Sequence, residues 1–132
     1  MARFMLDTDV CIYVMKNQPE RLIERFTRLA PHLSVSSVSL AELYAGAGKS
    51  RRRETNIEAI EQFIARIEVL AFGADAARHY GEIRASLESA GQPAGAFDML
   101  IGGHARAENL AVVTNNTREF ERMPGVRVEN WL

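Results

Sequence analysis

The sequence is poor in cysteine, and this scarcity excludes several kinds of protein. Cys11 is the single cysteine among 132 residues, so neither a disulfide framework nor a cysteine-based zinc site is available to the chain. No apolar run approaches the roughly 18 residues that a membrane-spanning helix needs. Acidic residues appear by position 7, where a signal peptide would still be apolar. We therefore expect a soluble, cytoplasmic protein with no membrane partner.

An excess of either charge is also missing. There are 16 Lys and Arg residues against 17 Asp and Glu residues, for a formal net charge of −1. Net charge therefore gives no sign of a nucleic-acid partner, although a local basic patch can still bind one. Hydrophobic residues make up 47% of the chain and charged residues 25%, which excludes a disordered, collagen-like or coiled-coil protein. The length suits a single domain over residues 1–132.

Short apolar segments alternate with amphipathic ones along the chain. The apolar runs predict strands at 4–6, 32–36, 69–72, 110–114 and 126–131. Stripes of apolar residues predict helices at about 9–15, 19–29, 38–47, 52–68, 76–87 and 97–108. This alternation favours an α/β sandwich around a mainly parallel sheet. Ligands of such sheets bind beyond the carboxyl ends of the strands, so the residues that follow each strand become candidates for function.

Several carboxylates stand alone in apolar surroundings. Glu42 and Asp98 are each the only charged residue in a long window when histidine is neutral, and Asp7 shares the segment 4–15 only with Asp9. A buried lone carboxylate is costly unless something compensates its charge. A divalent cation compensates several carboxylates at once, and oxygen ligands with few histidines favour Mg²⁺ or Mn²⁺ over zinc.

The positions of these acids agree with a shared site. Asp7 follows the first predicted strand, and Asn115 and Asn116 follow the strand at 110–114, with Glu119 one turn further on. In a parallel sheet such residues converge on one edge. Converging carboxylates that hold one or two Mg²⁺ ions can activate water for attack on a phosphodiester.

Each acid also has a simpler explanation when it is taken alone. Asp7, Asp9 and Asp98 can each cap a helix or favour its N-terminus. Glu42 and Glu119 can be solvated surface residues, and the asparagine pair is typical of a plain turn. The occurrence of several isolated acids at element ends is what favours a site.

The basic run of the chain consists of Lys49, Arg51, Arg52 and Arg53. Such a run is typical of a solvated helix start. It is also suited to contacting the phosphate backbone of RNA near the mouth of an acidic site. Few aromatic residues interleave with these charges, so a base-stacking platform is not indicated.

Four segments carry a resemblance to a known family: FMLDTDVCIY, VSSVSLAELYAGA, GQPAGAFDMLIGGHA and LAVVTNNTREFERMPGVRVENW. In this order and spacing they resemble the PIN-domain ribonucleases, in particular the VapC-type toxins of bacterial type II toxin–antitoxin pairs, over nearly the whole chain. The resemblance implies a three-layer α/β/α sandwich and an endoribonuclease that depends on Mg²⁺ or Mn²⁺.

The resemblance also assigns roles to single residues. The first three family acids, which hold the metal and carry catalysis, fall on Asp7, Glu42 and Asp98. Asn116 stands where a fourth acid is common, so Glu119 is expected to contribute to catalysis through water. The remaining residues of this segment would orient water or a carboxylate; they are Thr114, Asn115 and Asn116.

Partners follow from the same resemblance. It implies a VapB-like antitoxin that blocks the acidic site, a homodimer, and a larger toxin–antitoxin complex that binds DNA only through the antitoxin. We expect an apolar groove between Leu22 and Phe26 of one helix and Ile60 and Phe63 of another to receive the antitoxin. Similarity to VapC toxins that cut initiator tRNA in the anticodon stem-loop makes tRNA the leading substrate.

Two other functions fit parts of the sequence. The segment DTDV after a strand also matches the opening of haloacid-dehalogenase-like phosphatases, with Asp7 as nucleophile and Asp9 as general acid. That chemistry needs a downstream lysine and a second acidic pair, and the only lysines are Lys16 and Lys49. The other alternative is a non-catalytic α/β interaction module in which the acids only cap helices.

Overall fold

A computed structural model describes residues 1–132, and its centre is a five-stranded sheet in which every strand pairing is parallel. The strand order is β3-β2-β1-β4-β5. The strands are β1 (Phe4–Leu6), β2 (Leu33–Ser36), β3 (Glu68–Leu70), β4 (Ala111–Val113) and β5 (Val128–Glu129). All five predicted strands are present, although most are shorter than the apolar runs from which they were predicted. Parallel pairing places the carboxyl ends of the strands along one edge.

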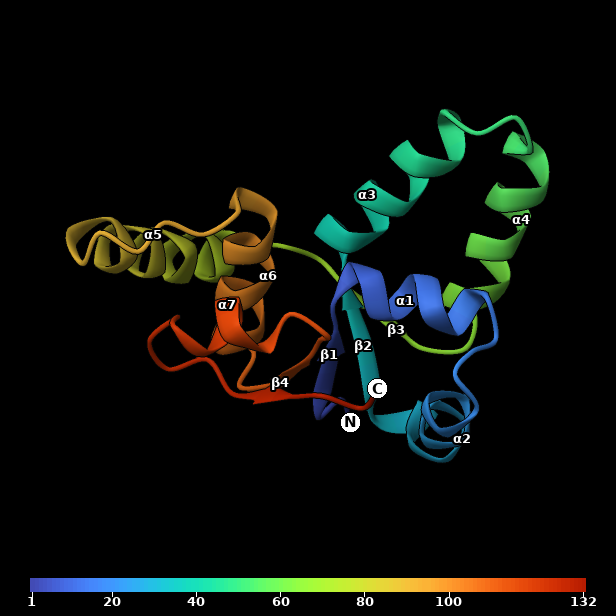
Figure 1. Cartoon of the computed structure of the whole chain (residues 1–132), viewed down its shortest axis with the longest axis horizontal. Coiled ribbons are helices and arrows are strands. Elements are labelled where there is room, and N and C mark those ends of the chain that lie inside the picture. Colours follow the sequence, from blue (N-terminus) through green and yellow to red (C-terminus); the bar gives the residue numbers. More distant parts are fainter.

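Helices connect these strands and cover both faces of the sheet (Figure 1). They are α1 (Thr8–Met15), α2 (Glu20–Leu29), α3 (Ser37–Gly48), α4 (Arg53–Ile64), α5 (Ala74–Ser89), α6 (Ala96–Ala107) and α7 (Thr117–Glu121). The predicted helix 52–68 ends early at Ile64, because the chain turns there to enter β3. The short helix α7 was not predicted from the sequence, and it carries Glu119.

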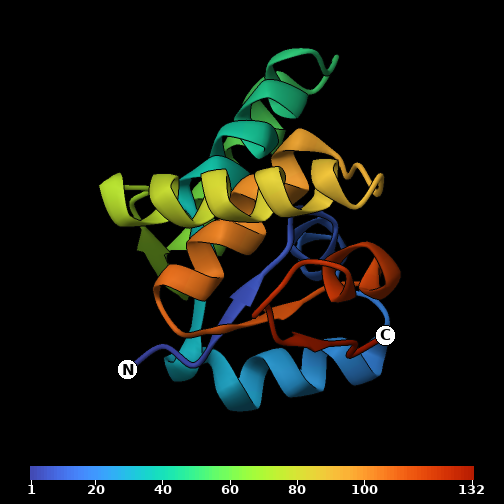
Figure 2. The same ribbon diagram turned by 90° about the vertical axis from the view of Figure 1, so that its left-hand side faces the viewer.

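Two separate hydrophobic clusters show that the architecture has three layers. Along β1, the side chains of Phe4 and Leu6 join one cluster, whereas that of Met5 joins the other, as expected when successive residues of a strand point to opposite faces. The first cluster packs under α1 to α4 and the second under α5, α6 and α7. Figure 2 shows α5 and α6 on the side of the sheet that faces the viewer. The α/β/α sandwich with a parallel sheet is confirmed.

Close packing between α5 and α6 fixes the helix that carries Asp98. A β-carbon at Gly103 would lie 2.7 Å from the backbone nitrogen of Tyr80, and one at Gly102 would lie 2.5 Å from the sulfur of Met123. At Gly103, where the close neighbour is backbone, only glycine permits this approach of the two helices. Since α6 cannot shift along these contacts, Asp98 is held at a defined place in its first turn.

The predicted antitoxin groove between α2 and α4 is wrong. Leu22, Phe26, Ile60 and Phe63 are all buried in the core, with at most 4% of any of them exposed. The rings of Phe26 and Phe63 are stacked with centroids 6.0 Å apart. These side chains pack against one face of the sheet. The apolar faces of α2 and α4 are therefore part of the core and are not free to bind a partner. No helix of the chain has both the length and the apolar character needed to cross a membrane.

Candidate active site

Asp7 lies at the carboxyl end of β1 and begins α1 as its N-cap. The Thr8 N–H donates to Oδ1 at 2.8 Å and the Thr114 hydroxyl donates to Oδ2 at 2.7 Å. Burial, reinforced by Asp9, raises the pKa of Asp7 to about 8, although the bonds from Thr114 and Thr8 favour the ionised form. Asp7 therefore holds a proton at neutral pH unless a positive charge replaces it.

Glu42 reaches the same edge of the sheet from α3. The Thr8 hydroxyl donates to Glu42 Oε1 at 2.7 Å and lies 3.0 Å from the Ser39 hydroxyl. Thr8 thus contacts two acids at once, Asp7 through its backbone N–H and Glu42 through its side chain. We call Asp7 and Glu42 the strand-side pair.

Asp98 and Glu119 form a second group, which we call the loop-side pair. The Asn116 side-chain amide donates to Glu119 Oε2 at 2.6 Å and lies 3.4 Å from Asp98 Oδ2. The Gly95 N–H, in the loop before α6, donates to Glu119 Oε1 at 2.7 Å. The loop-side pair is therefore joined through Asn116, much as the strand-side pair is joined through Thr8.

The loop-side pair shares a single proton. Partial burial, followed by the hydrogen bond and charge of Glu119, raises the pKa of Asp98 to about 7. The hydrogen bond from Asp98 lowers the pKa of Glu119, and the donors on Gly95 and Asn116 lower it further. These donors stabilise ionised Glu119, so Asp98 holds the proton.

The acids of both pairs act on one another without a cation between them. The negative charges of Asp9 and Glu42 contribute to the raised pKa of Asp98, so the two pairs lie at one edge of the sheet. All four salt bridges of the structure lie elsewhere, and they join arginines of α5 and α6 to acids of α5. The acids of the site therefore have no salt-bridge partner, although the charge of Arg122 acts on Glu119 and helps to lower its pKa.

These donors fit a hard divalent cation. Every candidate ligand is a carboxylate oxygen, which Mg²⁺ and Mn²⁺ prefer. No group of three His, Cys, Asp or Glu side chains lies together in a way that could hold a metal ion, so the role of these acids as metal ligands stays a prediction.

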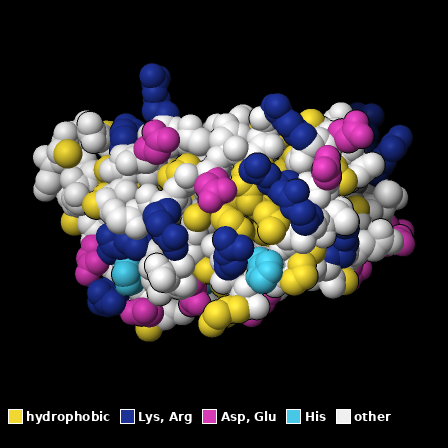
Figure 3. All heavy atoms as spheres, turned by 90° about the horizontal axis from the view of Figure 1, so that it is seen from below, with side chains coloured by type: hydrophobic (Ala, Val, Ile, Leu, Met, Phe, Trp, Pro, Cys, Tyr) yellow, Lys and Arg dark blue, Asp and Glu magenta, His cyan; other side chains and the backbone are white.

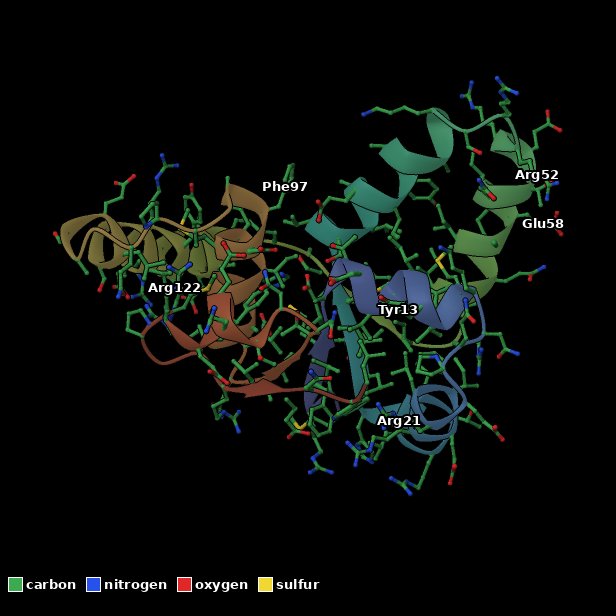
Figure 4. The ribbon with its side chains drawn as sticks, viewed as in Figure 1. Tyr13, Arg21, Arg52, Glu58, Phe97 and Arg122 are labelled. Carbon is green, nitrogen blue, oxygen red and sulfur yellow. The ribbon has the colours of Figure 1, made fainter.

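The structure groups most of the predicted site residues, although their roles stay predictions. Both acid pairs lie at one edge with Thr114 and Asn116 bonded to them. Asn115 points elsewhere and lines a hollow beside Tyr13. The basic run lies far away at the turn between α3 and α4, where Arg52 is labelled in Figure 4; its members are Lys49, Arg51, Arg52 and Arg53.

Thr8 and Gly95 are contributors that the sequence reasoning missed. Thr8 lies between two acids in the segment DTD. A hydroxyl group beside a candidate ligand could have been recognised as a hydrogen-bond donor to the acids. Gly95 donates from its backbone N–H. Every residue except proline has this group, so the sequence does not predict which one makes the contact.

Two hollows of different character flank α1. One, of about 300 Å³, begins at Thr8 and Glu42 and continues between α1, α3 and α4; its apolar lining includes Ile12, Met15, Leu43 and Ile60. The other, of about 440 Å³, is polar and lies between α1, α2 and the end of β4; its lining includes Tyr13, Gln18, Arg21 and Asn115. The first hollow therefore opens directly onto the acid site, whereas the second approaches it through Asn115, the neighbour of Asn116.

A parallel α/β/α sandwich with acids at the carboxyl edge of its sheet is compatible with a metal-dependent nuclease, and comparison with known proteins identifies the family. The chain belongs to the PIN domain family, which matches residues 4–126. Among curated relatives, it is 51% identical over 131 residues to the "tRNA(fMet)-specific endonuclease VapC" of Shigella flexneri, with 99% of each chain covered. It is 45% identical over 132 residues to "Ribonuclease VapC2" of Haemophilus influenzae, with all of each chain covered.

Solved structures agree with this assignment. The DNA-bound VapBC complex of Salmonella typhimurium contains a chain that matches with a TM-score of 0.96 and 49% identity, covering 100% of both chains. VapBC2 of Rickettsia felis, bound to a fragment of its promoter DNA, matches with a TM-score of 0.92 and 38% identity over 98% of both chains.

These relationships confirm the predicted function class. The chain is an endoribonuclease of the VapC type, the toxin component of a toxin–antitoxin pair. The phosphatase alternative is wrong, since the family and the fold are those of PIN-domain ribonucleases. The reading as a non-catalytic interaction module is wrong for the same reason.

Proposed function

We propose that this protein cleaves RNA with Mg²⁺, or Mn²⁺, held by Asp7, Glu42 and Asp98, while Glu119 contributes to catalysis through water. The observation that carries the proposal is the grouping of the acids at one edge of the sheet, where Thr8 joins Asp7 to Glu42 and Asn116 joins Asp98 to Glu119. The raised pKa values of Asp7, about 8, and of Asp98, about 7, agree with this grouping. They mark two carboxyls that lack a positive partner at the carboxyl edge of the sheet, where ligands of parallel sheets bind.

The division of labour follows from the contacts. When bound, the cation supplies Lewis acidity and a water of lowered pKa for attack on a phosphodiester. Thr114 and Thr8 orient the Asp7 carboxylate, and Thr8 also orients Glu42. Asn116 orients Asp98 and Glu119. Fixing the direction of ligand oxygens in this way raises metal affinity.

The substrate we propose is tRNA, specifically the anticodon stem-loop of initiator tRNA. The relatives from Shigella and Salmonella are named for tRNA(fMet), and the similarity to them runs through the segments that hold both acid pairs. The loop-side pair is only partly buried, and Asn116, which joins its two acids, is exposed, so a folded RNA has access to them.

The partner we propose is a VapB-like antitoxin seated in the apolar hollow beside α1. This hollow takes the place of the groove expected between α2 and α4. It is lined by Ile12, Met15 and Leu43 and ends at Glu42, so a segment with apolar side chains that filled it would also cover the strand-side pair. The toxin is expected to form homodimers and, with its antitoxin, a larger cytoplasmic complex that contacts DNA only through the antitoxin.

The test is the sequencing of RNA 5′ ends after a short pulse of expression, with the wild type beside Asp7→Asn. New ends confined to the anticodon stem-loop of initiator tRNA, present only with the wild type, support the proposal. Purified protein is then assayed on the same tRNA with Mn²⁺ and with EDTA. Cleavage in EDTA, or identical RNA ends with the variant, would overturn it.

A further inference from the structure

One face of α1 leads from the acid site into the polar hollow. Asp9 and Tyr13 lie four residues apart and therefore share a face of this helix. Asp9 contributes to the raised pKa values of both Asp7 and Asp98, so it belongs to the acid site. Tyr13 lies one turn further on and leaves 36% of its surface exposed. An aromatic ring thus stands at the surface one helical turn from the acids.

The opposite wall of the hollow carries hydrogen-bonding and cationic groups. Asn115 follows β4 directly and is the neighbour of Asn116, which contacts the loop-side pair. Arg21 of α2 lines the hollow and reaches the Leu132 carbonyl oxygen, which fixes the place of its guanidinium. Figure 4 shows Tyr13 on α1 and Arg21 on α2 below it. Arg21 forms no salt bridge with an Asp or Glu side chain.

Positive charge continues beyond the hollow, away from the acids. Arg25 lies one turn after Arg21 on α2, shares an adjoining hollow with it, and has its guanidinium carbon 5.4 Å from the centre of the Trp131 ring. In Figure 3, which views the molecule from the side of α2 and the chain ends, Lys and Arg side chains are spread over the surface. A polyanion that leaves the acid site along this path meets the arginines Arg21 and Arg25.

We propose that the polar hollow is a binding subsite for the RNA strand beside the scissile phosphate, with a base stacked on Tyr13 and a phosphate bound by Arg21. This inference rests on the proposed ribonuclease function. Aromatic rings bind the faces of unpaired bases and arginine binds phosphate oxygens, and a cleaved loop supplies both groups. The apolar hollow on the other side of α1 has no aromatic ring and no arginine in its lining, and its one basic side chain is Lys16.

Steady-state cleavage of an initiator-tRNA anticodon stem-loop oligonucleotide, in Mn²⁺, tests the subsite. We expect Arg21→Ala to raise KM about tenfold and to reduce the salt slope of log KM by about 1. Arg28→Ala is the matched control, because Arg28 is an exposed arginine of the same helix that does not line the hollow. It should leave KM and the salt slope at their wild-type values.

Two substitutions of Tyr13 distinguish stacking by its ring from hydrogen bonding by its hydroxyl. Tyr13→Ala should raise KM about tenfold through the loss of stacking, whereas Tyr13→Phe should keep the wild-type KM because it retains the ring. Equal effects of Arg21→Ala and Arg28→Ala overturn the proposal, as does a wild-type KM for Tyr13→Ala. Thermal melting of each variant shows whether it is folded.

Two further outcomes distinguish a failure of the proposed ribonuclease function from a failure of the proposed subsite. A wild-type protein that cleaves no RNA defeats the proposed function itself, whereas wild-type cleavage with unchanged KM in the Arg21 and Tyr13 variants defeats only the subsite. Variants that lose affinity for the antitoxin but keep their KM for RNA would show that the hollow binds protein, which also overturns the proposal.

Discussion

The strand-side and loop-side pairs consist of the same chemical groups but are held in different ways. Asp7 is 3% exposed at the end of a central strand, and Thr8 joins it to Glu42. Asp98 and Glu119 are only partly buried, and the exposed Asn116 joins them. One half of the site is therefore continuous with the core, whereas the other half depends on a loop and on the five-residue helix α7.

This difference separates two tasks. The strand-side pair is placed by the sheet, so it gives the site a fixed reference point. In the loop-side pair, the packing of α6 holds Asp98, whereas Glu119 lies on the short helix α7, whose position can adjust when a cation and RNA bind. Substitutions in the two pairs should therefore differ in what they change.

The largest effect is expected from removing an acid of either pair. Asp7→Asn and Asp98→Asn should each reduce RNA cleavage by more than about 100-fold, because partners that only orient a ligand already account for about 10- to 100-fold. Circular dichroism should show a folded protein in each case. Asp75→Asn, which alters an exposed salt bridge of α5, is the control and should cleave at the wild-type rate. Full activity in either site variant would refute the assignment of these acids.

The bridging residues should have smaller effects. Thr8→Val keeps the shape of the side chain but removes the hydroxyl that donates a hydrogen bond to Glu42. Asn116→Ala removes the side-chain amide that donates to both acids of the loop-side pair. Each should weaken the apparent Mn²⁺ affinity in the cleavage assay by about tenfold. If only one of the two did so, the two bridges would not be equivalent.

The stability of the metal-free protein should fall as the pH rises. The pKa values of Asp7 and Asp98 are raised from 3.8 to about 8 and about 7, so the folded chain binds protons that the unfolded chain has released. Their favourable contribution is fully present below pH 4 and is lost as the pH rises through 7 and 8.

Melting temperatures measured in EDTA from pH 4 to pH 8.5 check this behaviour. Asp98→Asn should remove part of the decline and Asp7→Asn a larger part, because the pKa of Asp7 is raised further. Saturating Mn²⁺ should flatten the decline in the wild type. An equal decline in all three proteins would contradict the pKa shifts.

The smallest effect is expected at Glu42 in metal-free buffer. Glu42→Gln removes one of the negative charges that act on Asp98 and leaves an amide oxygen to accept from Thr8. Relief of like-charge repulsion should raise the melting temperature by a few degrees. An equal or lower melting temperature would argue against clustering of the acids.

The sequence predicted the strand-side half of the site better than the loop-side half. Asp7 directly follows a run of apolar residues, so the end of β1 and the position of its carboxylate could be deduced together. Glu119 lies in a charged segment with no apolar periodicity, and α7 is only five residues long. Neither this helix nor the contact of Glu119 with Gly95 could therefore be predicted from the sequence. The predicted antitoxin groove failed because an apolar stripe shows that a helix face is covered, but it does not show what covers it.

Isothermal titration of the metal-free protein with Mn²⁺ tests the central claim most directly. The account predicts saturable binding by the wild type at neutral pH and loss of that binding in both Asp7→Asn and Asp98→Asn, because each acid pair supplies a ligand. A wild type that binds no Mn²⁺, or variants that bind it as tightly as the wild type, would contradict the account.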